Sequence, residues 1–261
     1  MNKLIFLLVF SALLSACSSL SVTTPTPIIE TPEISGSDSF KFGASATLTS
    51  GNKYEATGDA SFRPPTLTSP AASHVLSTLG GVHADFLQRF RLGLGGDPFN
   101  GGLFGQAQIQ VFGDGRTTAK KGNFSMSVFG HAGNNNPDKN GDQSGAFGPG
   151  GNPWSAEIKS DWYDYGTSIG YRVSDATNLF VGVAKQLLLY RIKIDQTQGV
   201  APNGIYQASD RGEANKIMGG FSWGGEKGEV SLGADYTDLR FNHAPKLHIA
   251  SISLGVALDF K

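Results

Sequence analysis

The sequence predicts an all-β protein, an antiparallel up-and-down β-barrel of about ten strands, preceded by a signal peptide and a disordered tether. From Phe40 onward, apolar and polar residues alternate with a period of two, as in strands whose two faces meet different surroundings. Glycine accounts for 35 of the 261 residues and phenylalanine for 17, which suits tight turns between strands rich in aromatic residues. Charged residues make up 16%, well below the ~25% of an average soluble domain.

Composition also excludes several classes of function. The formal net charge of −1 argues against a nucleic-acid partner, which would require a basic surface. The single cysteine excludes a disulfide framework and a cysteine-based zinc site. The hydrophobic content of 39% is too high for a fully disordered chain.

The N-terminus has the pattern of an export signal. Lys3 supplies a positive charge, and residues 4–14 form an apolar run. That run is too short to span a bilayer, which takes about 20 residues, but it suits the hydrophobic region of a secretory signal. The only cysteine, Cys17, directly follows Leu14-Ser15-Ala16.

Leu14, Ser15, Ala16 and Cys17 resemble the lipobox of bacterial lipoproteins. The resemblance implies that residues 1–16 are removed as a signal peptide, that the Cys17 thiol carries a diacylglycerol, and that the new amino terminus is acylated with a fatty acid such as palmitate. Ser18 in place of Asp implies sorting to the outer membrane by the lipoprotein export machinery. An ordinary secretory signal followed by an accidental cysteine is the alternative.

Residues 17–38 are predicted to be a tether. Ser, Thr and Pro dominate this stretch, and Pro25, Pro27 and Pro32 exclude a helix and a central strand. At ~3.1 Å per residue, such a semi-extended segment could reach ~60 Å from its lipid. We expect the β-barrel domain to occupy residues 39–261.

The first part of this domain predicts a hairpin and a helix. Alternation over 40–48 and 54–62, around the turn residues Ser50-Gly51-Asn52, predicts two paired strands. Ser69-Pro70 resembles a helix N-cap followed by proline at the first helical position, and it predicts a short helix over 71–79 that ends at Gly80-Gly81.

The rest of the chain predicts further strands separated by turns. Alternation is found over 86–94, 103–111, 124–131, 163–173, 180–191, 217–223, 230–237 and 250–260. Two long polar connections, 133–153 and 196–211, fall at the same end of the barrel, and an even strand number places both termini and the tether at the other end. An eight-stranded barrel over 82–261, with the first hairpin as an accessory, is the alternative.

The body resembles the small outer-membrane β-barrels of Gram-negative bacteria, which have even strand numbers, short periplasmic turns and long outer loops. The last strand fits their C-terminal pattern, because apolar residues alternate up to Phe260, although Lys261 follows. Tyr163 and Tyr171 lie ~26 Å apart along one strand, close to the height of the apolar band of such barrels.

A soluble barrel on a lipid tether, as in surface lipoproteins of the transferrin-binding or factor H-binding type, is the alternative to a membrane barrel. In that case the apolar face would point inward and the polar face outward, and alternation by itself does not say which face is inside. In the membrane barrel, a set of charged residues would project into the lumen and form salt bridges there: Arg89, Arg91, Arg172, Lys185, Asp164 and Asp235.

No catalytic, cofactor or metal site is predicted. The five histidines form no metal-binding pair. Ser127 and His131 share a strand face but lie ~13 Å apart, so they cannot act as nucleophile and base, and His131 is expected to be a polar residue at a strand end. Asp138–Asp142 lacks the spacing of a calcium-binding loop. The chain is therefore predicted not to be an enzyme.

The function predicted from the sequence is a structural or surface-interaction role in the bacterial outer membrane, exerted through the long outer loops. The expected partners are outer-membrane lipid, the barrel-insertion and lipoprotein-export machineries, and a surface protein or glycan. Lipidation of Cys17 is the one modification predicted. Under the soluble alternative, the tethered barrel would bind a ligand or a host protein.

Overall fold

The computed structural model describes residues 19–23, 28–36, 40–57, 73–98, 102–135, 143–146, 153–196, 204–242 and 246–260. These residues form β-strands and connections, with no α-helix among them. The strands are β1 (Ser19–Thr23), β2 (Lys41–Thr57), β3 (Ser73–Phe86), β4 (Phe90–Asp97), β5 (Gly102–Phe112), β6 (Phe124–Asn135), β7 (Gln143–Ala146), β8 (Pro153–Arg172), β9 (Thr177–Gln196), β10 (Gly204–Gly225), β11 (Gly228–Phe241) and β12 (Leu247–Phe260).

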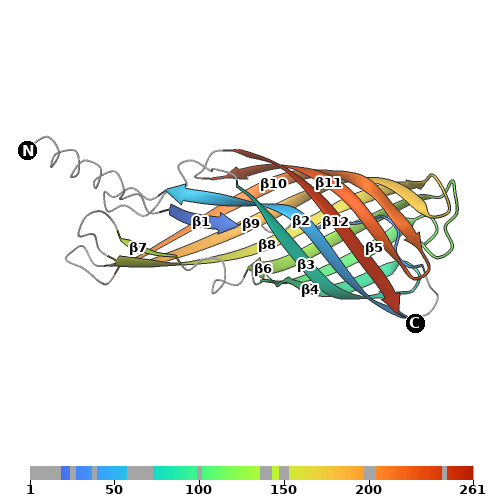
Figure 1. The fold of residues 1–261 in the computed structure, drawn as a ribbon, viewed down its shortest axis with the longest axis horizontal. Helices are drawn as coiled ribbons and strands as arrows, with labels where there is room; N and C mark the ends of the chain where they lie inside the picture. Colours follow the sequence, from blue (N-terminus) through green and yellow to red (C-terminus); the bar gives the residue numbers. More distant parts are fainter. Residues whose placement is uncertain are drawn as a thin grey trace, which may run out of the picture.

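The sheet closes on itself. β2 pairs with β3 along one edge and with β12 along the other, so the antiparallel ladder forms a ring, seen as a tilted cylinder in Figure 1. β1 pairs with β2 and β7 with β8 outside this ring, so that ten of the twelve strands make up the barrel. The predicted ten-stranded up-and-down barrel is confirmed. The eight-stranded alternative is wrong because β2 and β3 are members of the ring.

The predicted hairpin around Ser50-Gly51-Asn52 is wrong. β2 passes through these residues without turning, and Gly51 pairs with Val75 of β3. Residues 58–62, the end of the second predicted strand, lie outside the described residues. The turn residues were misleading because a neighbouring strand satisfies their backbone hydrogen bonds and holds them extended.

The predicted helix over 71–79 is also wrong, because Ser73–Phe86 forms strand β3. Gly80 and Gly81, predicted to end the helix, pair with Gly96 and Gly95 of β4. Ring closure requires a strand between β2 and β4, and this tertiary requirement overrides a local capping signal. The strand count stays at ten because β3 replaces the strand lost from the hairpin.

The stretch 86–94, predicted as one strand, spans the tight turn between β3 and β4. Leu87 and Gln88 have positive φ angles of 52° and 61°, in the left-handed region that tight hairpin turns use. The strand of this stretch is therefore the part from Phe90 onward.

The two ends of the barrel differ in their connections. At the turn end, where β12 finishes beside the start of β2, the strands are joined by residues 87–89, 113–123, 173–176 and 226–227. At the loop end they are joined by residues 58–72, 98–101, 136–152, 197–203 and 242–246. The C-terminal strand finishes at the turn end, as predicted. β1 pairs with the loop-end part of β2, away from the C-terminus (Figure 1), so the prediction that the whole tether lies at the turn end is wrong.

The polarity of the wall is inverted relative to a soluble protein. Apolar side chains on the outer face are exposed, for example Leu94 at 70% and Ile252 at 65%, whereas Ser127 and Ser168 on the inner face are fully buried. Aromatic residues gather on the outer face at the turn end, where Phe40, Phe86 and Phe90 pack in series. A closed barrel satisfies its backbone hydrogen bonds in lipid, and with an apolar exterior it has the architecture of an outer-membrane β-barrel.

This polarity contradicts the soluble alternative, in which the apolar face would be inside. Among the residues that the structure describes, no helix has the length and hydropathy needed to cross a membrane. Part of the inner face is apolar as well, because Phe129, Ala184 and Met218 form a buried cluster there.

Candidate functional site

The lumen holds a segment of the chain itself. Residues 28–36, hereafter the plug, lie inside the barrel in its turn-end half. Glu33 is 1% exposed, and Ile34 and Ser35 are fully buried. This stretch belongs to the region predicted as a tether, so the part of it that the structure describes between β1 and β2 is enclosed by the wall.

The first half of the plug binds the wall through two side chains. Glu30 Oε1 lies 2.8 Å from Nε2 of His131 on β6, and both groups are buried. The Thr31 hydroxyl donates to Glu229 of β11 at 2.8 Å, and the Gln108 amide of β5 donates to the Thr31 carbonyl at 2.6 Å. The plug is therefore fixed to strands on different sides of the ring.

The second half is held by a buried ion pair. Arg172, the last residue of β8, places its Nη2 2.7 Å and its Nε 2.9 Å from Glu33 Oε2. The Asn123 amide donates to Glu33 Oε1 at 3.0 Å. Charge-assisted bonds of this kind are among the strongest available in a protein, and both side chains are nearly inaccessible to solvent here.

The backbone of the plug also forms hydrogen bonds with the wall and with the turn-end connection. The Ser35 amide donates to Asp85 at 3.0 Å and the Ile34 amide to the Gln110 side chain at 3.1 Å. The Arg116 amide then donates to the Ile34 carbonyl at 2.7 Å. These bonds give partners to several backbone groups of the buried residues, as burial requires.

Gly36 lets the plug pass close to the turn-end connection. Its φ is +70°, in the left-handed region, and a Cβ there would lie 2.5 Å from Cα of Gly115. A side chain at either glycine would push the two backbones apart, so this close approach requires glycine at both positions.

A network of ion pairs lies around the plug. The Arg91 guanidinium donates to both oxygens of Asp85 at 2.7 and 2.9 Å. Arg116 lies 3.1 Å from Glu229 and also pairs with Asp259. Charges inside a barrel wall must be matched in this way, because an unpaired one would carry its full desolvation cost.

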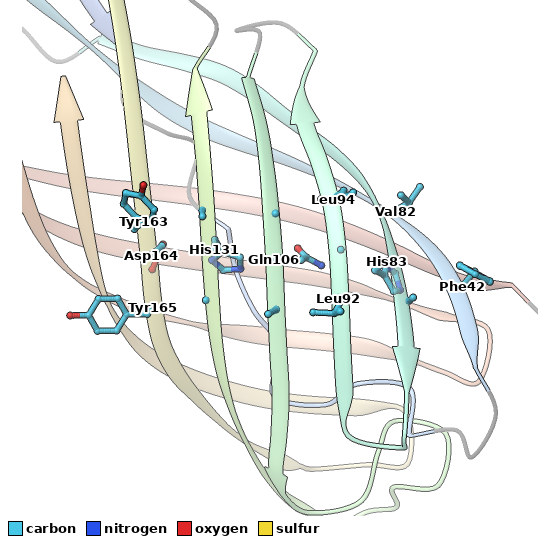
Figure 2. A pocket seen from close by; sticks show the side chains of 16 residues that line it. Phe42, Val82, His83, Leu92, Leu94, Gln106, His131, Tyr163, Asp164 and Tyr165 are labelled. Carbon is cyan, nitrogen blue, oxygen red and sulfur yellow. The ribbon is translucent and has the colours of Figure 1, made fainter. Parts of the chain in front are cut away.

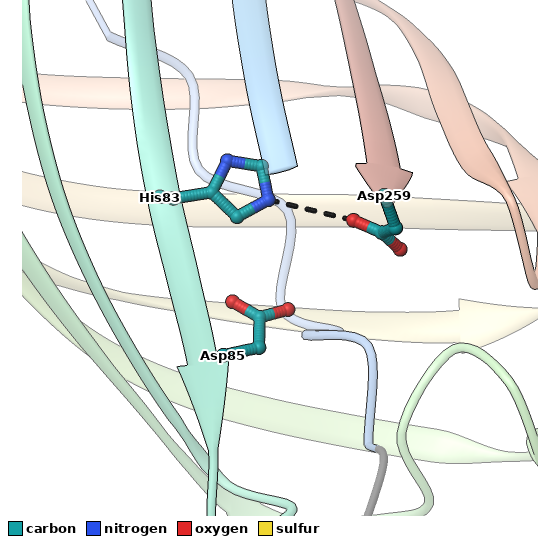
Figure 3. A group of neighbouring side chains, drawn as sticks. All are labelled: His83, Asp85 and Asp259. Atoms are coloured by element: carbon teal, nitrogen blue, oxygen red, sulfur yellow. Dashed lines mark hydrogen bonds and ion pairs between the residues drawn. The ribbon is translucent and has the colours of Figure 1, made fainter. Parts of the chain in front are cut away.

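His83, Asp85 and Asp259 have the composition of a metal site (Figure 3). Their candidate ligand atoms lie within 4.8 Å of one another, and His83 Nε2 is 3.4 Å from Asp259 Oδ1. However, Asp85 already receives the Arg91 guanidinium and Asp259 that of Arg116. Two guanidinium groups at this point neutralise the carboxylates that would attract a cation, so the cluster belongs to the ion-pair network.

The sequence missed this cluster, although one signal was present. His83 and Asp85 are two residues apart, and therefore on the same face of a strand. Their partner Asp259 comes from the other end of the chain, so only closure of the barrel brings it near.

The charged residues predicted to face the lumen divide into two groups. Arg91, Arg172, Asp164 and Asp235 are buried there, and Asp164 pairs with Lys216 at 2.9 Å. The other two predictions are wrong. Arg89 is exposed in the β3–β4 turn, and Lys185 lies on the outer face, 3.0 Å from Glu213. The apolar run around Leu187 and Leu189 had obscured the face assignment of β9.

His131 was wrongly predicted to be a polar residue at a strand end. It is buried in the lumen with Glu30 as its partner, a contact that sequence reasoning could not foresee because the plug was taken for a tether. Ser127 does share its face, as predicted. Cys17 and the stretch Asp138–Asp142 lie outside the described residues.

The outer wall carries a shallow groove of about 870 Å³ across β5 and β6. Its floor consists of small outward-facing residues: Gly105, Ala107, Gly130 and Ala132. The strand register places Leu94 on one side and Tyr163 on the other. In Figure 2 the labelled leucines and tyrosines point away from the barrel, whereas His83 and His131 point inward. The floor of the groove therefore faces the membrane.

Comparisons with known proteins found similar solved structures but no family. No family model matches the chain, and no curated protein matches it. Similar solved structures include the attachment invasion locus protein Ail of Yersinia pestis, with a TM-score of 0.35, 8% identity, and coverage of 85% of this chain and 97% of that one. The outer-membrane protease OmpT of Escherichia coli gives a TM-score of 0.47 at 7% identity, covering 94% and 96%. Neisserial surface protein A gives 0.28 at 11% identity, covering 85% and 97%.

The prediction that the chain is not an enzyme is contradicted by these comparisons. An outer-membrane protease is among the similar structures, so the barrel fold is shared by enzymes and by proteins of other kinds. At 7% identity this comparison does not show that the present chain is an enzyme.

Proposed function

We propose that this protein is a lipid-anchored barrel of the Gram-negative outer membrane that acts at the cell surface through the structures at its loop end. The observation that carries the proposal is the inverted polarity of the wall, with apolar side chains outside and polar ones inside. This distribution suits a bilayer and would be unstable in water, where a soluble barrel buries its apolar face.

Three strands supply a rigid platform at the loop end. β8 and β9 have 20 residues each and β10 has 22, compared with 14 in β11 and β12. The outer faces of these loop-end halves are charged, with Glu157, Lys159, Asp161, Arg191, Lys193, Arg211 and Glu213. Charged side chains on the lipid face are costly at the bilayer midplane and tolerated near its surface. These halves therefore stand above the apolar band.

Surface recognition fits this arrangement better than solute flow. Loops on a rigid scaffold carry recognition in many proteins, and a charged platform suits polar contacts to a surface protein or a glycan. The bore of a ten-stranded barrel is narrow, and here the plug lies in it.

The lipid anchor is the second part of the proposal. It rests on the lipobox pattern Leu14-Ser15-Ala16-Cys17 and on the fact that Cys17 is the only cysteine. Mass spectrometry of the N-terminal peptide of the mature protein is expected to find acylated Cys17, and an unmodified Cys17 would overturn this part.

Membrane fractionation tests the integral barrel independently of the lipid. The mature chain with Cys17→Ser is exported behind a signal peptide cut by the general signal peptidase. We expect it to remain in the membrane after carbonate washing and to migrate faster on gels without boiling, because detergent alone does not open a closed barrel. Release into the soluble fraction, with no effect of boiling, would exclude the integral barrel.

Binding of the purified barrel in detergent micelles to a glycan array tests the surface role. A variant with Arg191, Lys193 and Arg211 replaced by Gln alters the platform without touching the lumen. We expect binding to fall in this variant and to persist in Lys120→Gln, which changes an exposed residue at the turn end. Equal signals from both variants would refute recognition by the platform.

A further inference from the structure

The position of β1 shows where the chain comes from before it enters the barrel. Ser19 pairs with Thr57 and Thr23 with Lys53, so β1 lies along the loop-end part of β2. β2 itself begins at the opposite end, where Lys41 pairs with Asp85. Lys41 and Lys53 are therefore separated by ~40 Å along the strand.

The contacts of the plug show in which direction the chain runs through the lumen. Ile29 lies against Gly233 and Glu30 against His131, both some way along their strands from the turn end. Glu33 then reaches Arg172, the last residue of β8, and Gly36 touches Gly115 in a turn-end connection. The plug thus descends towards the turn end, where β2 starts.

The order of these contacts is that of a threaded chain. It runs from β1 at the loop end, down through the lumen as the plug, and out at the turn end into β2. A chain that entered and left by the turn end could not place β1 where it is, because the link over 24–27 spans at most ~18 Å against the ~40 Å to be covered.

We propose that the N-terminus of the mature protein emerges at the cell surface, so that the acyl chains on Cys17 insert into the outer leaflet of the outer membrane. Outer-membrane barrels have their longer connections outside, which assigns the loop end to the cell exterior. Cys17 is two residues from Ser19, and two residues of fully extended chain span at most ~7 Å. The position of the lipid rests on the proposed lipidation, whereas the threading does not.

This arrangement has a physical consequence for the anchor. The wall holds the plug through two buried pairs, Glu30 with His131 and Glu33 with Arg172. The plug joins the lipid on Cys17 at the loop end to strand β2 at the turn end, and both the lipid and the barrel lie in the same membrane. The tether therefore does not extend into the periplasm. Residues 17–38 therefore do not hold the barrel ~60 Å away from its lipid as predicted, because their length is taken up inside the barrel.

Thiol labelling in intact cells tests the threading. Ser21→Cys reports on β1, Arg191→Cys on the loop end, and Lys120→Cys on the turn end, and each is treated with a membrane-impermeant maleimide. We expect Ser21→Cys to label in intact cells like Arg191→Cys, and Lys120→Cys to label only after permeabilisation. Labelling of Ser21→Cys only after permeabilisation would overturn the proposal.

A second variant covers the case in which pairing to β2 shields the thiol in β1. Ser21 is the register partner of Glu55, so Ser21→Cys with Glu55→Cys should form a disulfide that is seen as a mobility shift on non-reducing gels after unfolding. Absence of both the surface label and the disulfide would refute the threading.

The unchanged protein separates the two proposals, because its only thiol is Cys17. Acylated Cys17 takes no maleimide. A label on Cys17 of intact cells would overturn the lipid anchor but would support the N-terminus at the surface.

Discussion

Replacement of Glu33 tests whether the plug is part of the barrel's stability. Glu33→Gln keeps the size of the side chain and removes its charge. Arg172 would then remain in the lumen with its backbone acceptors, the carbonyls of Asp175 and Arg116, but without a carboxylate. The variant thus isolates the ion pair between the plug and β8.

The magnitude follows from burial. Both partners are nearly inaccessible, with side-chain exposures of 3% for Arg172 and 2% for Glu33. Removing one partner of such a pair costs about 3–5 kcal/mol, because the remaining charge is left without compensation. The amide of Gln still accepts a hydrogen bond, and two carbonyls still receive Arg172, so we expect a loss of about 3 kcal/mol.

Denaturant unfolding in detergent micelles, followed by tryptophan fluorescence, measures this loss. The matched control is Glu157→Gln, which breaks an exposed pair with Lys159 at 2.9 Å and should leave the unfolding midpoint unchanged. The double variant Glu33→Gln with Arg172→Gln should regain part of the stability, because neither charge is then left unpaired. A midpoint for Glu33→Gln equal to that of Glu157→Gln would refute the reasoning.

Three further predictions concern the lumen. Deletion of residues 28–36 should give small conductance steps in planar bilayers where the intact protein is silent, and equal silence of both would contradict a plug that fills the polar path. Gly36→Ala should lower the free energy of unfolding by at least ~1–2 kcal/mol in the same denaturant assay, because φ is +70°, whereas Gly225→Ala, with open space at its Cβ, should not. Lys216→Met should cost about 3–5 kcal/mol by leaving Asp164 unpaired in the lumen, and a loss no larger than that of Lys185→Met at the exposed pair with Glu213 would count against it.

The fold class was predictable because alternation is a local property. Each strand shows its two faces within a few residues, as in the run from Ile252 to Phe260 in β12. The errors lie where local turn or cap chemistry competed with pairing. Ser50-Gly51-Asn52 has the composition of a turn and Ser69-Pro70 that of a cap, but the neighbouring segments are held in β2 and β3 by their partners in the ring.

The candidate site was only partly predictable. Alternation placed Arg91, Arg172, Asp164 and Asp235 on the polar faces of their strands, which turn to the lumen in a membrane barrel. Their partners could not, because Glu33 comes from a stretch without periodicity and Lys216 from another strand. Composition rich in Pro and Thr predicts an extended segment but does not distinguish one in solvent from one inside a barrel.

By itself, the sequence determined the all-β class and an antiparallel barrel of about ten strands, each with one polar and one apolar face. Only the tertiary structure decided that the polar face is inside and that residues 28–36 lie within it. The physical reason is that a strand carries its alternation regardless of its neighbours, whereas inside and outside are defined only once the ring closes. The buried carboxylates of the plug find their cations only on strands that closure brings around them.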